Sequence, residues 1–171
     1  LNPNLLWQRI ELAFDNNSLA LVKQLNSWLP ASSQSELKLW LQVRANPNLV
    51  TQENLFKPLN AHKRKILVDG IEALTKKNPL QVVGMWPTLQ ATYDFNVADQ
   101  QVVTRAIAIA LARFAHPDAS EWLAKVEPTY SNQVVREWRI RAALLAQDWS
   151  DVREQINALP PHEKETSGWR Y

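Results

Sequence analysis

Carboxylates are the side chains in this sequence that could carry acid–base chemistry. Most glycosidases place a pair of them on either side of the bond, one as the acid and the other as base or nucleophile. The candidates here lie among Lys and Arg on the polar faces of expected helices, which favours solvated surface positions. They are Glu11, Asp15, Glu121, Glu127 and Glu137. The sequence therefore identifies no catalytic residue.

The residues that could bind a metal or a cofactor are few. His62, His116 and His162 lack a second His or a carboxylate at metal-ligand spacing on one helix face, and each is expected in a turn near a helix start. The three glycines are isolated, so there is no phosphate-binding loop. Cys is absent, which excludes thiolate metal sites and cysteine nucleophiles. We expect no metal and no cofactor.

Two basic groups could contact an anionic polymer. The run His62–Lys63–Arg64–Lys65 begins an expected helix, and a solvated helix face is the preferred interpretation. Arg136, Arg139 and Arg141 surround Trp138, and we expect their stems to lie over a packed helical hairpin rather than to form a binding strip.

Tryptophan is abundant, with eight residues, and an exposed indole can stack on a sugar ring. Most of these residues fit the apolar stripe of their helix, where large rings fill the space between paired helices. We expect core positions for most of them and surface positions for Trp149 and Trp169. The eight are Trp7, Trp28, Trp40, Trp86, Trp122, Trp138, Trp149 and Trp169.

Composition limits the class of protein. The 171 residues are 21% charged and 46% hydrophobic, as in an ordinary globular domain. A net charge of +2 is too small for a nucleic-acid-binding surface. No apolar run approaches the roughly 18–20 residues of a membrane span, and from the N-terminal pattern we expect no signal peptide. The chain begins with Leu1, so we expect both ends to be cut ends of a longer protein.

Helical periodicity extends over nearly the whole chain, whereas strand patterns are rare. Apolar residues recur every three or four positions, which predicts amphipathic helices. In residues 134–145 the predicted buried stripe consists of Val134, Trp138, Ala142 and Leu145. The helical stripes cover residues 6–14, 21–29, 37–41, 67–74, 103–114, 134–145 and 152–159.

Polar and proline residues predict where these helices begin and end. Ser33 and Glu36 have capping-box spacing, and Asn60 and Ser131 are expected to open helices. Pro87 lies inside an apolar series and predicts a kink or break. Asn-Pro at 46–47 and 78–79 and His-Pro at 116–117 separate helices. The result is about nine or ten short helices in stacked antiparallel hairpins.

An internal sequence repeat favours a solenoid fold. With an offset of 130 residues, a stretch near the start matches one near the end, and both read as long helix, polar turn, helix, then Leu-Pro. One hairpin type therefore occurs at least twice, as in α-solenoids.

Several segments, taken in order, resemble the soluble lytic murein transglycosylases of Gram-negative bacteria. The likeness covers essentially all 171 residues, and its closing part is similar to the family's signature hairpin. The segments are LLWQRIELA at 5–13 followed by Asn16–Asn17, VRANPN at 43–48, RIRAAL at 139–144, Asp148–Trp149, Leu159–Pro160 and Trp169–Arg170–Tyr171.

The resemblance implies an α-α superhelix from the helical region of such an enzyme. It also implies a periplasmic location and a glycan polymer as the ultimate substrate. The family's catalytic motif is a Glu followed by Ser, with Gly-Leu-Met-Gln further on. No Glu-Ser occurs here, and Met85 lies in Val-Gly-Met-Trp. We therefore expect residues 1–171 to be one superhelical segment without a catalytic residue, and the lysozyme-like catalytic domain to lie beyond Tyr171.

Our interpretation is an all-α superhelical scaffold that orients peptidoglycan glycan strands or periplasmic cell-wall proteins and is not itself an enzyme. The parent enzyme would cleave the glycan without water and leave 1,6-anhydromuramic ends. One alternative is a tetratricopeptide-like protein-interaction scaffold unrelated to the cell wall. Another is a helical-repeat nucleic-acid binder, which would show a steep salt dependence. We expect no nucleic-acid partner and no membrane span.

Overall fold

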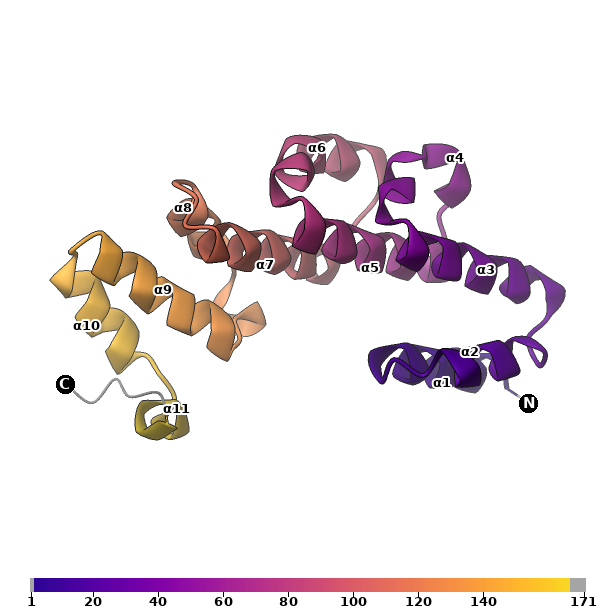
Figure 1. Cartoon of the computed structure of the whole chain (residues 1–171), viewed down its shortest axis with the longest axis horizontal. Helices are drawn as coiled ribbons and strands as arrows, with labels where there is room; N and C mark the ends of the chain where they lie inside the picture. Colours follow the sequence, from indigo (N-terminus) through magenta and orange to yellow (C-terminus); the bar gives the residue numbers. More distant parts are fainter. Residues whose placement is uncertain (1, 167–171) are drawn as a thin grey trace. The chain divides into compact units, whose positions relative to one another are not determined.

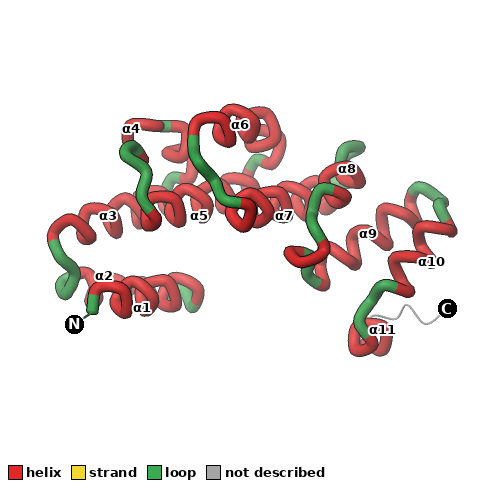
Figure 2. The backbone as a smooth tube through the Cα atoms, turned by 180° about the vertical axis from the view of Figure 1, so that it is seen from behind, coloured by secondary structure: helices red, strands yellow, loops and turns green. Residues whose placement is uncertain are grey.

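The computed structural model describes residues 2–166, and every regular element in this range is helical. Helices are joined by short loops and turns (Figure 1), and the described part contains no strand (Figure 2). The all-α prediction is confirmed. The described residues form eleven α-helices and two short 3-10 helices: α1 (Pro3–Asp15), α2 (Leu19–Asn26), α3 (Ala31–Ala45), η1 (Pro47–Thr51), α4 (Glu53–Phe56), α5 (Ala61–Lys77), α6 (Pro79–Thr92), α7 (Val97–Arg113), α8 (Ala119–Ala124), η2 (Pro128–Tyr130), α9 (Gln133–Leu145), α10 (Trp149–Asn157) and α11 (Pro161–Thr166).

The chain divides into two compact units, Leu1–Gly70 and Ile71–Tyr171, with the boundary inside α5. The first unit begins with the α1–α2 hairpin. Its turn contains Asn17 with φ 54°, a left-handed conformation that Asn tolerates better than most residues. Leu6, Ile10 and Phe14 are buried at a spacing of four, so α1 presents one apolar face to its neighbours.

Aromatic side chains fill the rest of this first core. The rings of Trp7 and His62 stack with centroids 4.1 Å apart. The indole N–H of Trp40 donates to Asp69 Oδ2 at 2.7 Å, and Arg44 Nη1 lies 3.2 Å from the same oxygen. The polar end of a buried indole thus has a partner, as expected for a large amphipathic ring in a core.

Gly70 marks a close approach between α5 and its neighbours. A Cβ atom placed here would overlap the side chains of Val43 and Val50, both of which are fully buried. Interiors pack at crystal-like density, so there is no free space to accept an added methyl group. Glycine at this position therefore lets α5 lie directly against α3 and η1.

In the second unit, α7 is the central element and packs against α6, α8 and α9. Its Val103, Ile107 and Leu111 are buried along one face. Phe114, which the sequence pattern placed on the same stripe, is 68% exposed, so that prediction is wrong. Phe114 is the C-cap residue of α7, where the chain leaves the helix and its face no longer follows the helical period.

The buried face of α9 differs from the prediction by one position. Val134 and Leu145 are 37% and 78% exposed, whereas Val135 and Ile140 are fully buried. The sequence pattern missed this because Arg139 lies on the packed side of the helix, where its guanidinium binds backbone carbonyl groups. A charged residue on the buried face interrupts the apolar pattern from which the buried face is predicted.

The predicted capping box at the start of α3 is also wrong. The helix begins at Ala31 with Pro30 as N-cap, so Ser33 and Glu36 already lie inside it. Proline fits the start of a helix because its missing N–H would have no partner there. Glu36 instead accepts a hydrogen bond from Asn60 Nδ2 at 2.6 Å.

Asparagine side chains cap the starts of α5 and α9. Asn60 opens α5 as predicted, since its Oδ1 accepts from the backbone N–H of Lys63 at 2.9 Å. The start of α9 is shifted by one residue from the prediction, because Asn132 rather than Ser131 is the N-cap. Its Oδ1 lies 3.0 Å from the backbone N of Val135. Either side chain suits this role, and sequence alone does not choose between neighbours.

Pro87 does not break α6, which runs from Pro79 to Thr92. A proline removes only its own backbone N–H, so the hydrogen bonds on either side can still form. Trp86 and Leu89 are buried next to it, and their packing stabilises the helical path. The break that the sequence allowed at this position does not occur, and the alternative of a kink stays a prediction.

Candidate functional site

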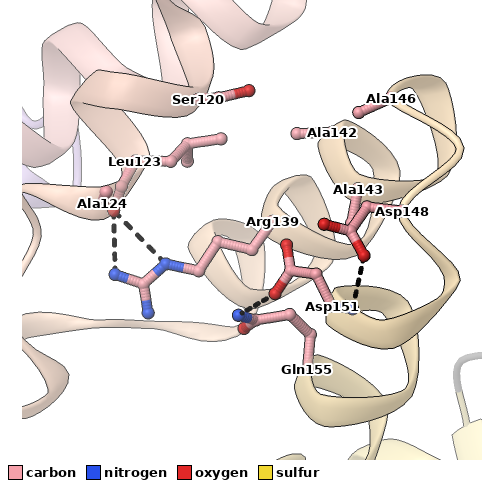
Figure 3. A pocket seen from close by; sticks show the side chains of 10 residues that line it. All are labelled: Ser120, Leu123, Ala124, Arg139, Ala142, Ala143, Ala146, Asp148, Asp151 and Gln155. Atoms are coloured by element: carbon pink, nitrogen blue, oxygen red, sulfur yellow. Dashed lines mark hydrogen bonds between the residues drawn. The ribbon is translucent and has the colours of Figure 1, made fainter.

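A cleft of about 320 Å³ lies between α8 and the α9–α10 hairpin (Figure 3). Alanine side chains leave the space for it, because large residues at the same positions would fill the gap between these helices. Polar side chains from α9 and α10 line the rest. The lining residues are Ser120, Leu123, Ala124, Arg139, Ala142, Ala143, Ala146, Asp148, Asp151 and Gln155.

Arg139 forms one wall of this cleft and fixes the end of α8. Its Nη2 donates to the carbonyl oxygens of Leu123 at 2.8 Å and Val126 at 2.6 Å. Burial lowers the pKa of Arg139, the nearby charge of Arg136 lowers it further, and Asp151 acts in the opposite direction. The guanidinium nevertheless stays charged at any physiological pH. It therefore binds one carbonyl group in the last turn of α8 and one just beyond the end of that helix.

The carboxylates of the cleft come from the start of α10. Asp148 is the N-cap, and its Oδ1 accepts from the backbone N–H groups of Ser150 at 3.1 Å and Asp151 at 3.0 Å. Asp151 Oδ1 accepts from Gln155 Nε2 at 3.0 Å. Figure 3 shows the contacts of Asp148 with Asp151 and of Asp151 with Gln155. Both side chains therefore accept hydrogen bonds at the start of α10.

The chemistry that this arrangement offers is recognition through hydrogen bonds. The carboxylates and Gln155 present acceptors and an amide, and Ser120 adds a hydroxyl group on the opposite wall. The alanine floor leaves room for a small apolar or methyl group. Hydroxyl and amide groups of a ligand would find partners in such a site.

The five carboxylates that were candidates from the sequence do not line this cleft. Glu121 forms a surface pair with Lys125 at 2.7 Å, and Glu137 pairs with Arg141 at 3.3 Å. Asp15 and Glu127 are exposed, and Glu11 is half-buried. The side chains that do line the cleft, Asp148 and Asp151 among them, were missed as a site. The only available signal was the Asp-x-x-Asp spacing at a helix start, which is common in helix caps.

The histidines lie near helix starts, as predicted, but His62 and His162 are inside the first turn of a helix rather than in a turn before it. His62 is the second residue of α5, and its Nδ1 is 2.8 Å from Glu36 Oε2. His116 Nδ1 accepts from the backbone N–H of Asp118 at 3.2 Å, just before α8. Within the described residues, no group of three or more His, Cys, Asp or Glu side chains could hold a metal ion.

The arginines around Trp138 each contact a different partner. Arg136 binds Glu163, Arg139 binds backbone carbonyl groups, and the guanidinium of Arg141 lies over the ring of Trp138 at 4.9 Å. These three arginines therefore form no continuous basic strip, and Trp138 is covered as expected. In the other group, Lys63 and Arg64 are half-buried rather than fully solvated.

Three tryptophans are buried as predicted, namely Trp7, Trp40 and Trp86. Trp149 is 67% exposed, which confirms its expected surface position. Trp28 is 48% exposed, although the sequence pattern placed it on a buried stripe. It follows the C-cap of α2, so the helical period no longer applies to it. The prediction for Trp169 lies outside the described residues.

The fold was compared with solved structures. The whole chain matches part of the crystal structure of the lytic transglycosylase Slt of Pseudomonas aeruginosa, solved as an inactive mutant, with a TM-score of 0.82 and 23% sequence identity. This likeness confirms the α-α superhelix class that the sequence predicted. The chain spans 28% of the length of that enzyme. The sequence matches no protein-family model and no curated protein.

Proposed function

We propose that this chain is a non-catalytic scaffold segment of a periplasmic peptidoglycan lytic transglycosylase. In this role it orients glycan strands, or proteins that act on them, for a catalytic domain carried elsewhere in the longer protein. The observation that carries the proposal is the match of the whole chain to 28% of a lytic transglycosylase at a TM-score of 0.82. The ordered resemblance of the sequence segments to the same class of enzyme supports it independently.

The site chemistry is consistent with binding rather than turnover. A general acid for glycan cleavage needs a carboxyl group kept protonated, which normally requires an apolar pocket. The carboxylates of the α8–α10 cleft instead lie among polar groups at a helix start and accept hydrogen bonds there. A series of stacked helices also offers an extended surface, which suits a polymeric ligand.

No helix among residues 2–166 is both long enough and apolar enough to cross a bilayer.

Sedimentation with purified sacculi tests this function. The chain should co-sediment with sacculi in high salt, where screened charge alone no longer binds, and should not sediment with cellulose. In a zymogram on peptidoglycan it should give no cleared band. A cleared band would overturn the non-catalytic assignment. Failure to bind sacculi would favour the alternative of a protein-interaction scaffold unrelated to the cell wall.

A further inference from the structure

A second hollow in the unit Ile71–Tyr171 has a different character from the α8–α10 cleft. It has a volume of about 380 Å³ and lies between the last turns of α5 and the C-terminal half of α7. Among the described residues, three cations, Lys76, Arg105 and Arg113, line it together with the carboxylate Glu72. Phe114 is also one of its lining residues. We call this hollow the cationic cleft.

The cations of the cationic cleft are available for a ligand. Arg105 uses Nη1 to donate to the backbone carbonyl of Tyr130 at 3.2 Å, which holds its side chain in place and leaves other N–H groups unused. Among residues 2–166, the side chains of Lys76 and Arg113 form no hydrogen bond or ion pair. Like charges gathered in one hollow repel each other, and a bound anion relieves that repulsion.

The helix dipole explains why each of two cations lies at the end of its own helix, but not why they line one hollow together. Lys76 lies in the last turn of α5, and Arg113 is the last residue of α7, where positive charge complements the helix dipole. That effect does not require the two to line the same hollow. It also does not explain Phe114, a large ring that is 68% exposed beside them. A cation cluster next to an exposed ring is instead the pattern of a site for an anion on an apolar body.

We propose that the cationic cleft binds a sugar ring that carries a carboxylate. Arg113 and Lys76 would bind the carboxylate through charge-assisted hydrogen bonds, which are the strong ones in proteins. Phe114 would pack against the C–H face of the ring, and the aliphatic floor formed by α7 would cover its edge. The identity of the sugar as a muramic acid residue rests on the proposed function, whereas the anion-plus-ring chemistry rests on the cleft alone.

An NMR titration of the labelled chain tests the ligand chemistry. N-acetylmuramic acid should shift backbone signals of residues 105–114. N-acetylglucosamine, which lacks the carboxylate, should bind about tenfold more weakly, since one charge-assisted contact is lost. Inorganic phosphate should compete poorly because it has no ring. Equal affinity for both sugars, equally good competition by phosphate, or shifts confined to other residues would each overturn the proposal.

Matched variants test the residues. R113Q should weaken binding of N-acetylmuramic acid about tenfold, and F114A about fivefold. R153Q removes an exposed cation elsewhere in the same unit, and W149A removes a ring that is equally exposed, at 67% against 68%. Both controls should bind as the unchanged chain does. If all four variants bind alike, the site assignment is wrong.

Sacculus binding separates this proposal from the proposed function. If R113Q and F114A keep full affinity for N-acetylmuramic acid while the unchanged chain still binds sacculi, the cationic cleft is not the site and the proposed function stands. A different result would separate the two proposals in the other direction. The unchanged chain would fail to bind sacculi, while N-acetylmuramic acid would still shift the signals of residues 105–114 and the variants would weaken that binding. The cationic cleft would then be confirmed and the proposed function would be wrong.

Discussion

Arg136 and Glu163 form a bidentate ion pair that joins α9 to α11. Arg136 Nε donates to Glu163 Oε2 at 2.9 Å, and Nη2 donates to Oε1. The side chain of Glu163 is only 4% exposed and that of Arg136 is 25% exposed. Two parallel charge-assisted hydrogen bonds define the geometry as well as the strength of such a pair. The short helix α11, with six residues, therefore depends on this contact for its position.

Replacing Glu163 by Gln should destabilise the chain by about 1–2 kcal/mol, less than for a fully buried pair because Arg136 keeps partial contact with water. The hydrogen bonds from Arg136 lower the pKa of Glu163 in the folded chain. The stabilisation is thus complete above the unfolded-state pKa of about 4.3 and is lost as the pH falls through the folded-state value. Urea unfolding at several pH values should show the difference between E163Q and the unchanged chain shrinking in acid.

The matched control for this prediction is E121Q, because Glu121 pairs with Lys125 on the exposed surface of α8. Exposed pairs contribute about 0–1 kcal/mol, so E121Q should unfold almost as the unchanged chain does. A difference between E163Q and the unchanged chain that stays constant down to strongly acidic pH would contradict the assigned role of the carboxylate.

The helices were predictable from sequence because most of their buried faces follow a simple period. In α1, for example, Ile10 and Phe14 are buried where the period places them. The errors arise where another interaction outweighs that period. On α9, Arg139 occupies the packed side, so the apolar stripe that includes Leu145 was assigned to the wrong face.

The candidate sites were much less predictable than the helices. The α8–α10 cleft exists because alanines from helices distant in sequence face one another, and the cationic cleft joins Lys76 to Arg113 across 37 positions of the numbered sequence. Such pairs depend on tertiary packing, which local spacing does not encode. We predicted that the five candidate carboxylates include no catalytic pair. This stays a prediction, and the zymogram tests it.

Arg139 should matter for stability more than an exposed arginine does. R139Q removes the donors to the carbonyl groups of Leu123 and Val126 and should cost about 2–3 kcal/mol, since hydrogen bonds from charged groups are stronger than neutral ones. R153Q, on the exposed side of α10, should cost less than about 0.5 kcal/mol. Urea titrations followed by circular dichroism compare the two. Equal midpoints would show that the carbonyl contacts contribute nothing.

Tryptophan exposure predicts which indoles a water-soluble quencher reaches. Trp149 is 67% exposed, whereas Trp86 is 3% exposed. W149F should therefore remove much of the fluorescence intensity that acrylamide quenches, and W86F should leave that quenched intensity almost unchanged. Steady-state quenching of both variants at equal protein concentration measures this. If W86F reduced the quenched intensity as much as W149F, the burial of the α6 face would be wrong.

Two helical glycines should respond to the same substitution with opposite signs. Alanine favours a helix over glycine by about 1 kcal/mol. At Gly84 an added Cβ meets no atom within 4 Å, so G84A should stabilise the chain by about that amount. At Gly70 the added Cβ overlaps Val43 and Val50, and overpacking a close-packed core typically costs about 1–3 kcal/mol. G70A should therefore lower the unfolding midpoint in urea while G84A raises it. Stabilisation by both variants would mean that α5 does not lie directly against α3 and η1.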